Sequence, residues 1–290
     1  MAVAAAPSAL VRRLRCLSLT SADVAGLAAF YQRAFGFRQL AAGRRGGPEF
    51  ERLMGVSAGA QCRVLALGRE SIELLQFDRA GAPYPAGSAA SDLVFQHFAI
   101  VVNDMTRAFE RLSAIEGWTA ISRQGPQHLP ESSGGVTAYK FRDPEGHPLE
   151  LLAFPAAATP PRWRGLPAGE PCLGIDHSAV SVADSARSIA FYAALGLQRS
   201  AHSLNSGAAQ QRLDDVSEAQ VQVTALTPPE PAPHLELLCY RAARRDAGTA
   251  LCSNDIAATR LVFESESVAR GAASAPRRLL DPDHHQLLIE

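Results

Sequence analysis

The chain repeats a short phrase at a constant separation, and this repeat limits the folds that the sequence can adopt. Aligned without a gap, identical residues lie 161 positions apart: Asp23 with Asp184, Phe30 with Phe191, and Tyr31 with Tyr192. Self-similarity at a fixed separation indicates a duplicated structural unit. We therefore look for the chemistry of the protein where the copies differ.

A further copy in the middle of the chain and a weaker one at its end make four units in all. The residue seven positions before the shared aspartate differs between the first three copies: it is Cys16, then His97, then His177. These three units also end alike, in Glu-Leu-Leu-x-aromatic segments that begin at Glu73, Glu150 and Glu236. The last unit offers Thr259 and Leu288 at the aligned positions.

Each unit reads as a strand, a helix and several more strands. In the third unit, His177, Ala179 and Ser181 alternate onto one face of the opening strand. An aspartate such as Asp184, or Ser185 beside it, can cap the helix that follows, and a glycine such as Gly196 can stop it. We therefore predict helices within 23–36, 104–117 and 184–196. Short antiparallel strands follow, such as 63–67 with 71–77 and 136–141 with 149–154.

Composition places the joints and excludes some partners. The proline-rich stretch 154–171 separates two predicted domains, 8–160 and 172–290, of two units each, while 78–92 and 242–254 connect units within a half. With 28 basic and 29 acidic residues, the chain lacks the basic excess expected of a protein that binds nucleic acid or an anionic membrane. Five cysteines without a CxxC pair favour a cytoplasmic protein.

These motifs together resemble the vicinal oxygen chelate superfamily, which includes glyoxalase I, extradiol dioxygenases and bleomycin resistance proteins. The resemblance is carried by the histidine that opens a unit, the Glu-Leu-Leu-x-aromatic tail, the Phe191-Tyr192 phrase and the turn at 141–147. It implies an α+β fold of four βαβββ units, which form two curved, barrel-like mixed sheets with helices on the outside. It also implies metal ligands that project inward from the first and last strands of a unit.

The uneven distribution of ligand-type residues favours one pairing of the units. If the second unit pairs with the third and the first with the fourth, His97, Glu150, His177 and Glu236 share one cavity, and the other cavity has no complete set. If neighbours within each half pair instead, neither cavity contains all four. Two imidazoles and two carboxylates suit a divalent ion such as Zn, Ni, Fe, Mn or Co. We prefer the first arrangement because one rule then gives one complete site and one blank site.

Structural roles compete with ligation at every one of these positions. A lone histidine on a strand is more often a core residue than a ligand, but His97 and His177 stand at the same distance from their aspartates and each has a downstream glutamate. Glu73 has lost its histidine partner, so a structural role is favoured there. Cys16 is better explained as a small buried residue than as a thiolate ligand.

The resemblance leads to one main functional hypothesis and two alternatives. The main hypothesis is a metal-dependent lyase or isomerase of the glyoxalase type, in which Glu150 or Glu236 moves a proton next to a carbonyl on a small substrate with two adjacent oxygens. The alternatives are an extradiol-type dioxygenase and a non-catalytic binding protein with a cavity lined by Trp118, Tyr139 and Phe141. Because four units complete both cavities within one chain, we expect a monomer or a homodimer.

Overall fold

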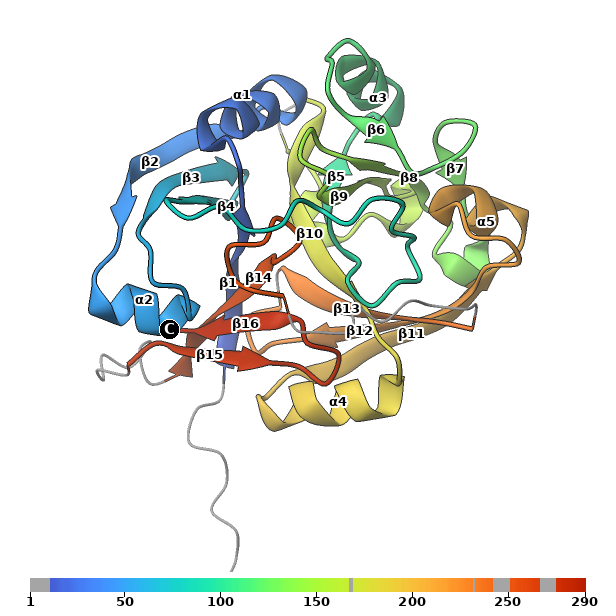
Figure 1. Cartoon of the computed structure of the whole chain (residues 1–290). Helices are drawn as coiled ribbons and strands as arrows, with labels where there is room; N and C mark the ends of the chain where they lie inside the picture. Colours follow the sequence, from blue (N-terminus) through green and yellow to red (C-terminus); the bar gives the residue numbers. More distant parts are fainter. Residues whose placement is uncertain (1–10, 167–168, 232, 242–250, 267–274) are drawn as a thin grey trace, which may run out of the picture.

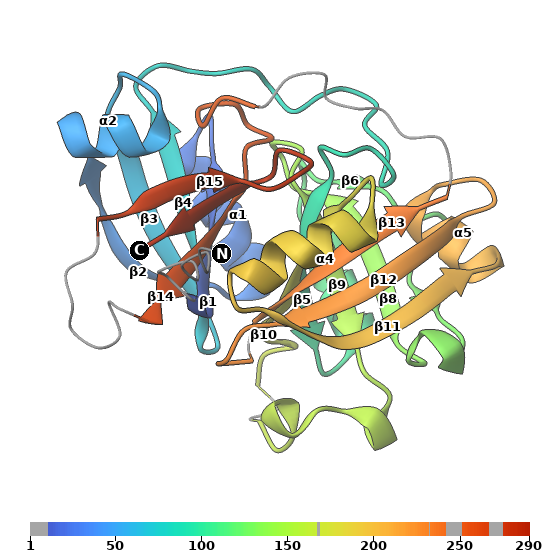
Figure 2. The same cartoon turned by 90° about the horizontal axis from the view of Figure 1, so that it is seen from below.

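Two curved sheets, with the longer helices on their outer faces, form the protein (Figures 1 and 2). The computed structural model describes residues 11–166, 169–231, 233–241, 251–266 and 275–290. The first unit consists of β1 (Val11–Thr20), α1 (Val24–Phe35), β2 (Arg38–Arg45), α2 (Pro48–Met54), β3 (Ala60–Leu67) and β4 (Glu70–Phe77). The second consists of β5 (Gln96–Val102), α3 (Met105–Ser113), β6 (Thr119–Ala120), β7 (Gln127–His128), η1 (Glu131–Ser133), β8 (Thr137–Arg142) and β9 (Pro148–Ala153).

The second half of the chain repeats this order. Two short 3₁₀ turns, η2 (Ala156–Ala158) and η3 (Pro161–Trp163), lie in the connector between the halves. The third unit consists of β10 (Cys172–Ser181), α4 (Ser185–Ala194), β11 (Gln198–Ser206), α5 (Ala208–Asp214), β12 (Gln220–Thr227) and β13 (His234–Tyr240). The described strands of the fourth are β14 (Arg260–Ser265), β15 (Arg277–Leu280) and β16 (Gln286–Ile289). Among the described residues, no helix is long and apolar enough to cross a membrane.

Strand pairing joins the second unit to the third and the first unit to the fourth. One sheet has the order β15-β16-β14-β1-β4-β3-β2, and the other has the order β11-β12-β13-β10-β5-β9-β8-β6, with β7 paired to β8. In each sheet the opening strands of two units pair antiparallel at the centre, β1 with β14 and β5 with β10. The predicted α+β class, the curved mixed sheets and the preferred pairing of units are confirmed.

Capping aspartates begin the three predicted helices as the sequence indicated. The carboxylates of Asp23, Asp104 and Asp184 each accept hydrogen bonds from backbone N–H groups in the first turn of α1, α3 and α4. Asp184, rather than Ser185, is therefore the cap of α4. Gly36 follows α1 with φ of +78°, which is the left-handed conformation expected at a helix end. These helices pack their apolar side chains on the outer faces of the sheets.

Two short helices, α2 and α5, were not predicted from the sequence. Seven residues each, they lack a side-chain cap and follow Gly47 and Gly207. In the first sheet, Phe50 and Met54 of α2 pack against inward-facing apolar residues, so that they fill the space over this sheet. In the second sheet, α5 contacts β8 and β11 and covers only part of the inner face. The two sheets therefore differ in what occupies their concave sides.

The recurrent aspartate turns hold the two sheets together. Asp143 of the second unit accepts a hydrogen bond from the hydroxyl of Tyr31 in α1 at 2.8 Å. His147 lies 2.8 Å from Asp143 through Nδ1 and 2.9 Å from the carbonyl oxygen of Thr20 through Nε2. In the other half, Asp281 accepts a hydrogen bond from Tyr192 at 3.0 Å. The Phe-Tyr phrase and the aspartate turn thus recur because they contact each other across the sheets.

The division of the chain into 8–160 and 172–290 stays a prediction about sequence repeats. Each sheet takes strands from both ranges, as Figure 2 shows for β1 with β14 and for β5 with β10. Most of the predicted joint at 242–254 lies outside the described residues.

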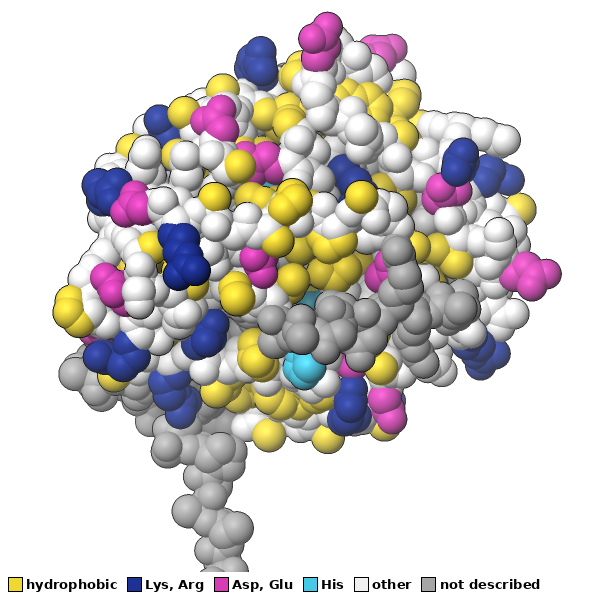
Figure 3. Space-filling model, viewed as in Figure 1, with side chains coloured by type: hydrophobic (Ala, Val, Ile, Leu, Met, Phe, Trp, Pro, Cys, Tyr) yellow, Lys and Arg dark blue, Asp and Glu magenta, His cyan; other side chains and the backbone are white. Residues whose placement is uncertain are grey.

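Lys and Arg side chains are interspersed with Asp and Glu on the face drawn in Figure 3, in agreement with the near-zero net charge.

We predict that His147 stabilises the fold in a pH-dependent way. Burial by itself lowers the pKa of His147, but the Asp143 carboxylate outweighs burial and raises it. Stabilisation is therefore complete below the unfolded pKa of about 6.5 and is lost as pH rises through the folded pKa. Urea unfolding of the wild type and of His147→Gln between pH 5.5 and 9 should show a difference that shrinks with rising pH. A difference of constant size would contradict this interpretation.

Candidate metal centre

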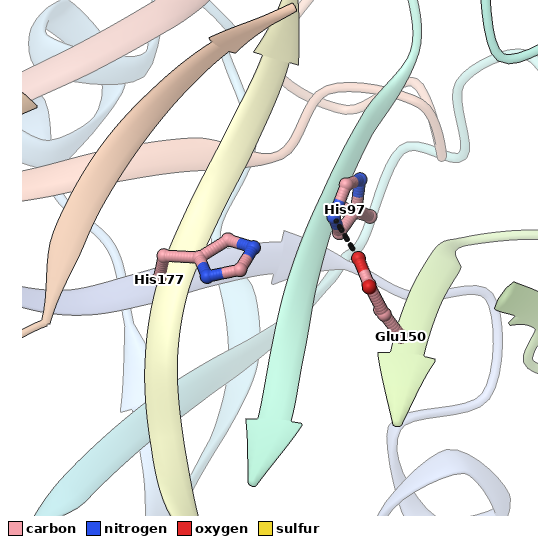
Figure 4. A group of neighbouring side chains, drawn as sticks. All are labelled: His97, Glu150 and His177. Atoms are coloured by element: carbon pink, nitrogen blue, oxygen red, sulfur yellow. Dashed lines mark ion pairs between the residues drawn. The ribbon is translucent and has the colours of Figure 1, made fainter. Parts of the chain in front are cut away.

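The central strand pair of the second sheet brings the two predicted histidines together. β5 and β10 run antiparallel with His97 opposite Ala179 and His177 opposite Ala99. Both imidazoles therefore point to the same face of the sheet, and their ring centroids lie 5.7 Å apart. Figure 4 shows the ring of His177 reaching from β10 toward His97 on β5. Side chains separated by eighty positions in the sequence thus meet at one place.

The two glutamates come from the last strands of their units. Glu150 on β9 pairs with Ala99 on β5, and Glu236 on β13 pairs with Ala179 on β10. The carboxylate of Glu150 lies 2.8 Å from Nε2 of His97 (Figure 4). The carboxylate of Glu236 lies 3.5 Å from Nε2 of His177. The structure therefore brings all four predicted residues to one face, although not at equal distances.

These side chains line a cavity of about 490 Å³ on the concave side of the second sheet. Its wall also carries apolar residues from both units: Leu129, Val136, Leu152, Leu213, Val223 and Leu238. His97 and His177 are almost completely buried, with 2% and 5% of their surface exposed. Among the described residues, Nδ1 of His97 and Nε2 of His177 lack a hydrogen-bond partner. Buried imidazole nitrogens without partners are expected where a ligand completes a site.

The residues present fit a divalent cation. Ligand atoms from His97, Glu150 and His177 all lie within 4.8 Å of one another, close enough for a single ion to contact each of them. Neutral imidazole and carboxylate are suitable ligands for Zn, Fe, Ni, Mn and Co. Glu236 is not in this close group, so it would have to move to complete a four-ligand set. No metal identity follows from the donor atoms alone.

Electrostatics around Glu150 favour the ionised carboxylate beside a neutral imidazole. Burial lowers the pKa of His97, and Glu150 only partly offsets this effect. Burial would raise the pKa of Glu150, but the hydrogen bond from His97 and the charge of Lys140 lower it. Lys140 is itself buried and lies 2.7 Å from Asp214 of α5. An uncharged imidazole next to an ionised carboxylate is the protonation state that metal binding requires.

The surroundings of His177 are more acidic. Burial alone would lower the pKa of His177, but the carboxylates of Glu236 and Asp176 raise it to about 9. Burial would raise the pKa of Glu236, yet the charge of His177 and a hydrogen bond with His234 lower it to about 2. An ion at this position would replace the proton on His177 as the counter-charge for these carboxylates.

Sequence reasoning missed Asp176 and His234 in this cavity. His234 opposes His177 in the parallel pairing of β10 with β13, and its ring centroid lies 5.3 Å from that of His177. The two ring nitrogens of His234 lie 3.7 Å from Asp176 and 3.5 Å from Glu236. The spacing of His234 two residues before Glu236 was an available signal, because both face the same side of a strand.

An arginine occupies the position in the first sheet where the fourth unit was expected to offer Thr259. Register corrects that alignment by one residue. Val262 pairs with Cys16 and Leu288, as Ala179 pairs with His97 and Glu236. Arg260 therefore occupies the position that His177 has in the third unit. The placement of Leu288 at the glutamate position is confirmed. The error arose because the phrase has no histidine in this unit to fix its alignment.

Arg260 is fully buried and is held by neutral oxygens. It donates to the hydroxyls of Ser18 and Thr20 at 3.2 and 3.0 Å, and to the carbonyl oxygen of Ser253 at 2.7 Å. Burial lowers its pKa to about 10, although the charge of Glu73 raises it. Glu73 in turn accepts a hydrogen bond from Ser18 and pairs with Arg45 at 2.5 Å.

Cys16 agrees with the structural role favoured for it. The residue lies in the apolar cluster beneath α2, and burial raises the pKa of its thiol to about 12. A protonated thiol is a poor metal ligand. The first sheet therefore has a guanidinium at the strand position where the second sheet has an imidazole beside a carboxylate.

We predict that Glu73 is needed for stability and not for metal binding. Glu73→Gln would leave Arg260 buried without its nearest counter-charge, at a cost of about 3–5 kcal/mol in the free energy of unfolding. The exposed Glu116→Gln is the matched control and should change stability by less than about 0.5 kcal/mol. Denaturant unfolding with metal analysis of both variants tests this. Loss of bound metal in a folded Glu73→Gln protein would refute it.

Sequence and structure comparisons agree with this architecture. Residues 13–151 match the family model described as Glyoxalase/Bleomycin resistance protein/Dioxygenase superfamily. A search of curated protein sequences gave no match. Glyoxalase I from Zea mays superposes with a TM-score of 0.58 at 16% identity, covering 96% of this chain and 92% of the maize chain. A mutant of the maize enzyme gives 0.61 at 17% identity, with coverages of 96% and 92%.

A protein from Bacillus subtilis strain 168, provisionally named a dioxygenase, has the same architecture. It superposes with a TM-score of 0.56 at 10% identity, covering 97% of this chain and 85% of that one. The family match covers the first two units of the chain, and the superpositions extend the fold over the third and fourth units. The strands of all four units are joined in two sheets of one polypeptide. Similarity at these identities shows the fold and leaves the activity to be argued from the site.

Proposed function

We propose that the protein is a metal-dependent enzyme of the glyoxalase type, a lyase or isomerase that acts on a small molecule with two adjacent oxygens. The observation that supports this most is the convergence of His97, Glu150 and His177 within 4.8 Å in one cavity, with Glu236 beside them. His97, Glu150 and His177 would hold the divalent ion, which would supply Lewis-acid chemistry to a substrate with two adjacent oxygens. Leucine and valine side chains form part of the cavity wall and reduce the contact of the reacting atoms with water.

Within this proposal, Glu236 is the proton-transferring base and Glu150 is the fixed ligand. Glu150 is pinned 2.8 Å from His97, and its side chain is only 9% exposed. Glu236 stands outside the close ligand group, 3.5 Å from His177, with its side chain 21% exposed. A carboxylate whose contacts to His177 and His234 are both 3.5 Å long can turn toward a substrate carbon and accept its proton more readily than one held at 2.8 Å.

Loss of a central ligand should abolish metal binding. In the purified protein we expect about one divalent ion per chain, and His97→Ala should contain little because one of three close ligands is missing. Metal analysis of both proteins after dialysis, with circular dichroism to confirm folding, provides the measurement. His128→Ala, an exposed histidine on β7, is the control. A folded His97→Ala protein with a full complement of metal would refute the proposed site.

Substitution of each glutamate should have a different effect on activity and on metal binding. Glu236→Gln should keep its metal and lose about 10²- to 10⁴-fold in kcat, because the base is removed. Glu150→Gln should lose metal affinity first and regain part of its activity at high metal concentration. Turnover of α-oxoaldehydes, with and without an added thiol, is the assay. The reverse pattern would exchange the two roles.

The structure also supports a second candidate, an extradiol-type dioxygenase. His97, Glu150 and His177 constitute two histidines and one carboxylate, the set that holds Fe(II) in such enzymes. His234 adds a further imidazole to the cavity, which the sequence had not revealed. Oxygen uptake with catechols after anaerobic loading of Fe(II) distinguishes the two activities. Isomerase turnover without oxygen consumption would exclude this candidate.

The non-catalytic binding alternative loses its expected support. Tyr139 and Phe141 lie in the main hydrophobic core with Trp118 packed against it, and none of the three lines the cavity.

We further propose that the protein works in the cytoplasm, since its five cysteines are free. Each sheet is completed within one chain, so the site requires no partner subunit, and a monomer or a homodimer would both be functional.

A further inference from the structure

A β-bulge places Asp176 beside His177 on the cavity side of β10. The pairing with β5 skips one residue here, since Ile175 opposes Ile100 while His177 opposes Ala99. In a regular strand, consecutive side chains point to opposite faces, so Asp176 would point away from the cavity. The bulge turns it, and both Asp176 and His177 line the cavity. Bulges next to active sites commonly redirect a side chain in this way.

The carboxylate of Asp176 is placed to fix the ring of His177. Its Oδ2 lies 3.2 Å from Nδ1 of His177, and its Oδ1 accepts a hydrogen bond from Nε1 of Trp163 at 3.2 Å. When Nδ1 carries the proton, the lone pair of His177 is on Nε2, the nitrogen without a hydrogen-bond partner among the described residues. That tautomer is the one that can bind an ion from Nε2.

Trp163 belongs to η3, in the connector that the sequence showed only as a proline-rich joint. The guanidinium of Arg162 lies over its ring at 4.1 Å. Arg162 pairs with Glu70 of the first sheet at 2.7 Å, and Glu70 also accepts a hydrogen bond from the backbone N–H of Ile175 at 3.2 Å. The connector is thus tied both to the first sheet and to the residue that precedes Asp176.

Gly174 shows how closely the connector packs on β10. A Cβ atom at this position would lie 2.8 Å from the ring of Trp163 and 2.4 Å from the carboxylate of Glu70. Only glycine lets the indole approach the strand near enough to reach Asp176. The contact is therefore built from three separate segments, namely the β3–β4 hairpin, η3, and the start of β10 with its bulge.

We propose that Asp176 and Trp163 are positioning residues for His177, so that the connector between the two halves sets the affinity of the site for its metal. The proposal rests on the metal-binding function proposed above. Within the described part of the chain, Nδ1 of His97 has no such partner, and its Nε2 faces Glu150. Gln96 stands in the corresponding place on a regular stretch of β5 and donates to Ser178 rather than to the imidazole. The two histidines are therefore inequivalent, and the restrained one is on β10.

Metal affinity of the full-length protein tests the proposal. Apoprotein variants are titrated with Zn²⁺ against a chelator of known affinity, and ions per chain are counted separately. For Asp176→Asn we expect the Kd for Zn²⁺ to rise by about 10- to 100-fold, the usual effect of losing a carboxylate behind a ligating histidine. Trp163→Phe keeps an aromatic ring but removes the N–H donor, so its Kd should rise by about 3- to 10-fold through the same contact.

Two controls separate positioning from general loosening of the fold. Trp118→Phe replaces the other tryptophan side chain of the protein by a smaller ring. Trp118 packs against Tyr139 and Phe141 and does not line the cavity. Gln96→Ala changes the residue before the other histidine. Both should keep the Zn²⁺ affinity of the wild type within about 2-fold. The visible spectrum of bound Co²⁺ should change in Asp176→Asn and Trp163→Phe and stay constant in the two controls.

Each outcome decides between specific alternatives. Unchanged affinity in Asp176→Asn overturns the proposal, and unchanged affinity in Trp163→Phe overturns the part assigned to the connector. Two ions in the wild type and one in Asp176→Asn would also overturn it, because Asp176 would then be a ligand of a second ion with His234. If the wild type binds no divalent ion, the proposed function itself fails.

Discussion

The antiparallel pairing of β5 with β10 is the interaction on which the site depends. It places His97 and His177 diagonally across one strand pair, and the parallel neighbours β9 and β13 then add a glutamate on either side. Strand-to-strand register allows no intermediate positions, because a slip of one residue would turn every inward side chain outward. A rigid sheet can therefore hold ligands from two distant units with the accuracy that a metal site needs.

The two sheets use the same framework for different purposes. Where the second sheet gathers imidazoles and carboxylates around open space, the first sheet contains Arg260 with Glu73, and α2 fills the space above them. A guanidinium is a permanent cation, so Arg260 neutralises the charge of Glu73 in the first sheet without a bound ligand. The cavity of the second sheet remains partly open because α5 reaches over β8 and β11 and leaves the strands at the centre uncovered.

Much of this arrangement could be predicted from the repeat, and the rest could not for identifiable reasons. Helix caps such as Asp104 and the glutamate tails are local signals that the fold preserves. The position of Arg260 depends on register in a unit that lacks the marker histidine. The proximity of Asp176 to the cavity depends on a bulge, which arises from pairing between strands and leaves no pattern in one of them. His234 faces the site because it lies two residues before Glu236 on the same strand, and this spacing was already visible in the sequence.

Charge balance connects these observations. Glu150, Glu236 and Asp176 all line one cavity, and burial of carboxylates is costly unless positive charge lies close to them. Lys140 lines the same cavity and lowers the pKa of Glu150, but its ammonium group is also paired with Asp214 at 2.7 Å. The first sheet meets the equivalent requirement of a single glutamate with two arginines, Arg45 and Arg260. Because Lys140 is shared between Asp214 and Glu150, the three carboxylates need further positive charge, which protons on the histidines or a metal ion would supply. The excess of carboxylates over fixed cations in this cavity supports the divalent cation proposed for it.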